Sequence, residues 1–236
     1  MQIDIYENVF IGNFIYTLGI QVGRILCQDK EQLPACINLL QQTPADRPLG
    51  DLFASFPGVS FLIEFKRESN KSLKEQKKLK ILRNEIRNKG EMTKISKSAH
   101  WFLQMKTPNS QEFQTVAVPY LEMDKIDTYL DEKHTFDSFI EKIVEQIFNF
   151  RETSGEINVG VSEVEMSAYL KFLGQIYRKS GVKSGGLVMT VSPDGGFTYI
   201  VTNDITQMLE KHKTIVRKHQ LELSRSSQLS YGGIER

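Results

Sequence analysis

The sequence predicts an α/β fold in which a central mixed β-sheet is flanked by helices and followed by a C-terminal α/β extension. The chain has 236 residues, 40% hydrophobic and 25% charged. This composition suits an ordinary domain with a sizeable core and excludes disorder or a collagen-like structure. A helical period over residues 6–27 precedes a β-rich hairpin over residues 51–66. Helical and strand segments then alternate to the end of the chain, with no internal repeat.

The first half of the chain carries the clearest patterns. Residues 6–27 place apolar side chains three and four positions apart, as an amphipathic helix covering a sheet does. Pro57-Gly58 separates two apolar, β-branched and aromatic runs, 51–56 and 59–66, and therefore predicts a hairpin. The next predicted elements are a lysine-rich helix at 72–89 and two strands, 101–105 and 115–120, joined by a polar turn.

The second half mixes helices with one further hairpin. The predicted elements are helices at 136–150 and 162–179, a hairpin at 187–201, a helix from 205 to about 223 and a loose tail at 224–236. No linker rich in Pro, Gly or Ser interrupts the chain. We therefore expect a core over residues 1–125 and an extension over residues 126–236 that packs on it.

Neither a secretory signal nor a membrane span is expected. The first seven residues lack a basic segment ahead of an apolar stretch. The longest uncharged run, residues 8–23, is short and contains polar side chains. The two cysteines, Cys27 and Cys36, are too few for a disulfide framework and are expected to be reduced. These observations predict a cytoplasmic protein without membrane contact.

Charge is segregated along the chain, although the total is only +1. Residues 64–99 hold 12 basic and 5 acidic side chains, a balance of +7, whereas residues 107–169 hold 4 and 13, a balance of −9. The positive block is typical of a surface that meets a phosphate backbone. A solvated helical face explains the same block equally well. Because the neutral total limits affinity, we expect a homodimer or a protein partner to help engage nucleic acid.

Three chemically complementary side chains are predicted to meet on the 51–66 hairpin. Side chains two positions apart in a strand share a face, so Glu64 and Lys66 point together and Phe65 points the opposite way. Asp51 opens the partner strand and can meet Glu64. Two adjacent carboxylates favour a hard divalent cation such as Mg²⁺ or Mn²⁺. Asp46 is an alternative acid, but it lies in a polar loop.

These residues resemble the PD-(D/E)xK nuclease superfamily, which has the restriction-endonuclease-like fold. The resemblance rests on Asp51, the hairpin and Ile63-Glu64-Phe65-Lys66, and it covers about residues 1–120. It implies that Asp51 and Glu64 bind the metal, that the carbonyl of Phe65 is a third ligand, and that Lys66 is the catalytic lysine. Gly50 departs from the pattern, since the family name expects proline there.

The resemblance adds further candidates on two helices. Glu7, on the first helix, matches a glutamate that some members place near the metal. Gln76, Lys77 and Lys80 lie on the helix after the motif and are candidate substrate contacts.

The sequence therefore predicts a metal-dependent nuclease that hydrolyses phosphodiester bonds, of DNA rather than RNA, in restriction, repair or antiviral defence. The preference for DNA rests on the family alone. Two other interpretations stay open. The three charged side chains could form a surface salt bridge, worth about 0.2–1 kcal/mol. Alternatively, an inactive nuclease fold could serve as an interaction or regulatory subunit of a larger complex.

Overall fold

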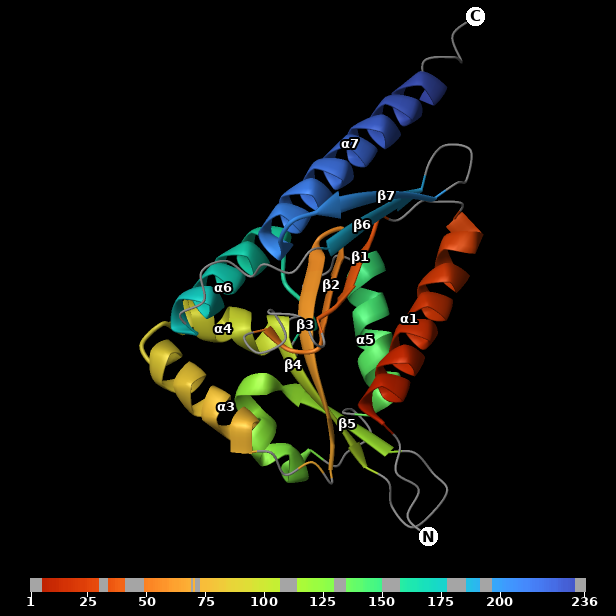
Figure 1. Cartoon of the computed structure of the whole chain (residues 1–236). Helices are drawn as coiled ribbons and strands as arrows, with labels where there is room; N and C mark the ends of the chain where they lie inside the picture. The colour runs from red at the N-terminus through yellow and green to blue at the C-terminus, as the bar shows by residue number, and fades with distance from the viewer. Residues whose placement is uncertain are drawn as a thin grey trace, which may run out of the picture.

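The structure is a computed structural model that describes residues 6–29, 34–40, 49–68, 70, 73–106, 114–129, 135–149, 158–177, 186–191 and 197–231. Its centre is a five-stranded mixed sheet with the order β1-β2-β3-β4-β5 (Figure 1). The strands are β1 (Cys36–Leu39), β2 (Leu52–Phe56), β3 (Val59–Arg67), β4 (His100–Lys106) and β5 (Gln114–Pro119). Among the strand pairs of this sheet in the described residues, only β3–β4 is parallel. The predicted α/β class with a mixed sheet is confirmed.

The hairpin of β2 and β3 forms as predicted because of its turn. Phe56 pairs with Val59, so Pro57 and Gly58 alone make the loop. Gly58 has a φ of +77°, the conformation that glycine adopts at the third position of a type II turn after proline. A two-residue loop sets the register of the strands, which opposes Leu52 to Ile63. The start of β2 therefore lies beside the final residues of β3.

The connection from β3 to β4 explains why this pair is parallel. Parallel neighbours need a long crossover, which here consists of α3 (Leu73–Ile86) and α4 (Gly90–Ala99). The sequence predicted one helix over 72–89 and did not predict α4. Both helices pack on one face of the sheet together with η1 (Tyr120–Thr128) and α6 (Glu163–Ile176).

The opposite face of the sheet is covered by α1 (Glu7–Asp29) and α5 (Phe136–Asn149) (Figure 1). Phe10 and Phe14 of α1 make edge-to-face contacts with Phe65 of β3. The stretch Glu7–Leu26 is long and apolar enough to cross a membrane by length and composition alone. Phe10, Phe14 and Leu18 are buried against the sheet, although only 28% of this stretch is buried.

The chain beyond residue 125 contributes to the hydrophobic clusters on both faces of the sheet. α5 packs with α1, and α6 places Met166, Tyr169 and Leu173 against the α3 and α4 side. β6 (Gly186–Val191) and β7 (Phe197–Thr202) form the predicted second hairpin, which meets the edge of the sheet at a bridge between Ala35 and Met189. The domain boundary at residue 125 stays a prediction.

The last helix, α7 (Ile205–Tyr231), runs about eight residues beyond its predicted end and into the segment predicted to be a loose tail. Its His212 accounts for part of its attachment. The side chain is buried and lies 3.1 Å from Ser55 Oγ of β2, and its Nε2 lies 3.2 Å from the carbonyl of Pro34. Since the carbonyl only accepts, Nε2 carries the proton and Nδ1 accepts from Ser55.

Candidate active site

Asp51 is held across the open end of the β2–β3 hairpin. Its backbone N–H donates to the carbonyl of Ile63 at 2.9 Å, and its Oδ2 accepts the N–H of Phe65 at 2.7 Å. The residue is only 3% exposed. The carboxylate of Asp51 thus takes the place of a backbone partner for Phe65, which lies on β3 beyond the first residue of β2.

Gly50 makes this position of Asp51 possible. Its φ is +107°, a conformation that strains side-chain-bearing residues and that proline cannot adopt. A Cβ at this position would lie 3.0 Å from the carbonyl oxygen of Ile63 and 3.4 Å from Glu64 Oε2. The absence of proline before Asp51 therefore has a local structural reason.

The hairpin brings Asp51, Glu64 and Lys66 together. Lys66 Nζ lies 2.7 Å from Glu64 Oε1 and 3.8 Å from Asp51 Oδ2. The two carboxylate oxygens are therefore no more than the sum of these distances apart, about 6.5 Å. Glu64 is 2% exposed, so this is a buried cluster rather than a surface salt bridge.

Glu7 joins the cluster from the first turn of α1. Its Oε2 lies 3.8 Å from Lys66 Nζ, and its Oε1 accepts a hydrogen bond from the side-chain amide of Asn70. Three acids from different parts of the chain thus surround one lysine. Asp46, the alternative acid, lies outside the described residues.

Two residues of α3 complete the site and were not among the predicted site residues. Lys78 Nζ lies 3.7 Å from Glu64 Oε2 and 2.8 Å from Glu75 Oε1. Tyr120 donates a hydrogen bond to Glu75 Oε2 at 2.8 Å. Glu75 lies four residues before the buried Leu79, and Lys78 lies four residues before the buried Leu82. This spacing is the signal that would have placed them at the edge of the apolar stripe.

The predicted substrate contacts lie elsewhere on the same helix. Gln76, Lys77 and Lys80 are exposed, whereas Glu75 is buried and Lys78 half-buried. They share α3 with the site but do not belong to the buried cluster, and their contact with substrate stays a prediction.

Burial and like charge shape the protonation of the cluster. Burial, followed by the charge of Asp51, raises the pKa of Glu64 from 4.5 to about 8, even though Lys78 and Lys66 act in the opposite direction. Burial by itself would lower the pKa of Lys66, but the Glu64 and Asp51 carboxylates raise it above its usual value. Lys66 is therefore protonated, whereas Glu64 is a weak acid even with two lysines beside it, so a further positive charge such as a bound cation would favour its ionisation.

The described residues contain no group of three or more His, Cys, Asp or Glu side chains arranged to hold a metal ion. A smaller set could hold one with water completing the shell, as Mg²⁺ often does. Glu64 Oε2 is buried and has no hydrogen-bond partner. The N–H of Phe65 points to Asp51, and its carbonyl points to the same side because both groups of a strand residue face the same neighbour. Asp51, Glu64 and this carbonyl are the groups that could hold a divalent cation.

Comparison with known proteins returned no relative: no family model, no curated protein and no solved structure matches this chain.

Proposed function

We propose that the chain is a metal-dependent nuclease that hydrolyses phosphodiester bonds at Asp51, Glu64 and Lys66. The observation that carries the proposal is the buried cluster itself, in which Lys66 Nζ lies 2.7 Å from one carboxylate and 3.8 Å from another. Burying two acids is costly unless a positive charge compensates them. An inert fold gains little from such a cluster, whereas a site for a cation and a phosphate requires it.

The element order supports a restriction-endonuclease-like fold. A helix, a hairpin with Asp on one strand and Glu-x-Lys on the other, further helices and then a parallel strand follow in the order that the PD-(D/E)xK resemblance implies.

Each side chain has a role in this chemistry. Asp51 and Glu64, with the Phe65 carbonyl, would hold Mg²⁺ or Mn²⁺. The bound cation would polarise the phosphate and favour ionisation of a water molecule. Lys66, protonated and aimed at the same point, donates hydrogen bonds to the attacking oxygen or to the phosphoryl oxygens as negative charge develops. Glu7 and Lys78 hold Lys66 and Glu64 in place from either side.

The exposed part of α3 suits a nucleic acid. Gln76, Lys77 and Lys80 face solvent, and cations at such positions bind phosphates without reading sequence. DNA is proposed over RNA on the strength of the family resemblance. A cytoplasmic location and a homodimer or protein partner belong to the same proposal.

A substrate panel tests the function. Wild-type protein is incubated with plasmid, linear and single-stranded DNA and with RNA, each with Mg²⁺, Mn²⁺ or EDTA. Asp51→Ala and Lys66→Ala are run beside Lys211→Ala, which removes an exposed lysine of α7. We expect cleavage only with a metal, and only by wild type and Lys211→Ala. No cleavage by wild type, or equal cleavage by all three variants, rejects the assignment.

An inactive interaction or regulatory subunit is the second candidate. The specific observation in its favour is that Lys66 Nζ already lies 2.7 Å from Glu64 Oε1, so Glu64 has a cationic partner without a metal. Mg²⁺ that fails to change the thermal unfolding temperature, together with absent cleavage, supports this candidate.

A further inference from the structure

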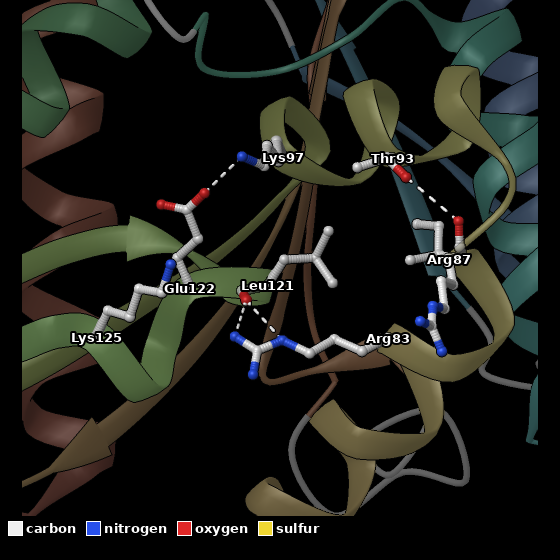
Figure 2. Close-up of a pocket in the computed structure, with 8 residues that line it drawn as sticks. Arg83, Arg87, Thr93, Lys97, Leu121, Glu122 and Lys125 are labelled. Atoms are coloured by element: carbon white, nitrogen blue, oxygen red, sulfur yellow. Dashed lines mark hydrogen bonds and ion pairs between the residues drawn. The ribbon is translucent and has the colours of Figure 1, made fainter.

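A basic cavity of about 480 Å³ lies between the end of α3, α4 and η1 (Figure 2). Four of its lining residues are cationic and one is acidic. The cations are Arg83, Arg87, Lys97 and Lys125, and the acid is Glu122.

Two of the four cations are already neutralised and build the walls. Arg83 donates to the carbonyl of Leu121 at 3.1 Å (Figure 2). It also donates to Asp124 Oδ2 at 2.7 Å, and the two contacts fix its guanidinium between α3 and η1. Lys97 Nζ lies 2.6 Å from Glu122 Oε1 on the opposite wall. Glu122, the acid of the lining, and Asp124 beside Arg83 are therefore both engaged in ion pairs.

The other two cations are at the rim. Arg87 and Lys125 are exposed, and within the described part of the chain neither has an ion pair with an acidic side chain. The four cations exceed the two neighbouring carboxylates, Glu122 and Asp124, by two positive charges, which matches the charge of one phosphate dianion.

The cavity floor is apolar and the volume exceeds what an isolated phosphate needs. Ile86 and Leu121 contribute to it and are both buried. The cavity is wide open to solvent, and its volume of about 480 Å³ is within the range of pockets that hold small organic ligands. An apolar floor below a cationic rim suits a planar ring joined to a phosphate, and the Arg87 guanidinium can also stack on such a ring.

The cavity is separate from the cluster around Glu64. None of the residues that line the cavity belongs to the cluster. Ile86, the last residue of α3, lies eight residues beyond Lys78, about 12 Å along the helix, and Arg87 follows the end of α3. A ligand in the cavity therefore does not lie on the candidate active site.

We propose that this cavity binds the phosphate of a nucleotide, with Arg87 and Lys125 as its ligands and Ile86 and Leu121 beneath the base. The phosphate could belong to a free nucleotide or to a nucleic-acid strand, since both offer the same chemistry. The site does not depend on hydrolysis at Lys66.

Isothermal titration calorimetry in EDTA, which suppresses metal-dependent cleavage, tests the proposal. The probes are ATP, AMP, adenosine, inorganic phosphate and a short single-stranded DNA. The variants are the double charge reversal Arg87→Glu with Lys125→Glu and the matched control Lys211→Glu with Arg217→Glu on exposed positions of α7. We expect AMP or ATP to bind wild type and the control alike, and the cavity variant to bind at least tenfold more weakly. Adenosine and inorganic phosphate should each bind more weakly than AMP.

The results distinguish a free nucleotide from a nucleic-acid strand as the source of the phosphate. If the DNA binds and mononucleotides do not, and the cavity variant no longer binds the DNA, the phosphate belongs to a nucleic-acid strand. Equal binding by the cavity and control variants, no binding of any phosphorylated probe, or inorganic phosphate binding as tightly as AMP overturns the proposal. Lys66→Ala should bind AMP like wild type, so failure of the nuclease assignment leaves this result unchanged. The milder variants Arg87→Gln and Lys125→Gln give smaller losses and guard against misfolding of the double reversal.

Discussion

Replacing Glu64 by glutamine should stabilise the metal-free protein while removing its response to Mg²⁺. The pKa of Glu64 rises from 4.5 to about 8 on folding because the carboxyl is buried beside Asp51. Between these values the folded state binds a proton that the unfolded state has released. The free energy of unfolding of wild type therefore falls as the pH rises from 4.5 to 8 and levels off above.

The size of the effect follows from that shift. One pKa unit corresponds to about 1.4 kcal/mol, so the whole shift sets an upper limit of about 5 kcal/mol. Relaxation around an ionised Glu64, and the lost ion pair with Lys66, reduce the gain to about 2 kcal/mol at pH 8. For a chain of this length that gain raises the unfolding temperature by about 4–8 °C.

The assay is urea unfolding in EDTA at several pH values between 5 and 9. The free energy of unfolding of Glu64→Gln should exceed that of wild type by an amount that grows up to pH 8. The exposed control Glu141→Gln should differ from wild type by no more than about 0.5 kcal/mol at every pH. With Mg²⁺ in excess, wild type should be stabilised by about 2 to 3 kcal/mol and Glu64→Gln should not. The interpretation of the buried cluster is wrong if the difference in free energy of unfolding between Glu64→Gln and wild type does not change with pH. It is also wrong if Glu64→Gln is less stable than wild type at pH 8.

Three further changes test the fold around the site. Gly50→Ala should lower the free energy of unfolding in urea by about 1–3 kcal/mol, because Gly50 has a φ of +107° and its Cβ would lie close to the Ile63 carbonyl. Gly12→Ala in α1, whose Cβ meets nothing within 4 Å, should instead raise it by about 0.5–1 kcal/mol. A similar effect of both substitutions would contradict the strain at Gly50. Burial lowers the pKa of His100 from 6.5 to about 3, so only the unfolded state binds a proton between these values. The free energy of unfolding should therefore fall as the pH drops below about 6.5. His100→Phe, which keeps the stacking on Tyr120, should make the free energy of unfolding less dependent on pH in this range. Ser162→Ala removes the side-chain oxygen that accepts the N–H of Glu165 and should lower the stability measured by thermal unfolding by about 1 kcal/mol. Ser162→Thr keeps a hydroxyl and should lower it less. Equal losses of stability in the two variants would argue against the capping box.

The hairpin could be predicted from sequence because each of its features is local. Strand alternation puts Glu64 and Lys66 on one face, and the Pro57-Gly58 turn determines which residue of β2 lies near them. The direction in which Phe65 points follows from the same period and is visible in its contacts with Phe10 and Phe14.

Other elements depend on tertiary contacts and could not be predicted so well. β1 has four residues, too few for a period, and is a strand only because β2 pairs with it. The 3₁₀ helix η1 has no periodic signature of its own. Lys78 belongs to a helix whose basic residues fit a solvated face and a phosphate-binding surface equally well by sequence. Its approach to Glu64 depends on how α3 packs on the sheet.

The rate of metal-dependent cleavage by Lys66→Ala tests the central claim most directly. On whichever nucleic acid wild type cleaves with Mg²⁺, the rate should fall by at least about 100-fold in Lys66→Ala. The reason is that the Lys66 ammonium group, which faces both carboxylates, would also face the reacting phosphate. Lys211→Ala should retain the wild-type rate. Cleavage by Lys66→Ala at the wild-type rate would contradict a catalytic role for the buried cluster.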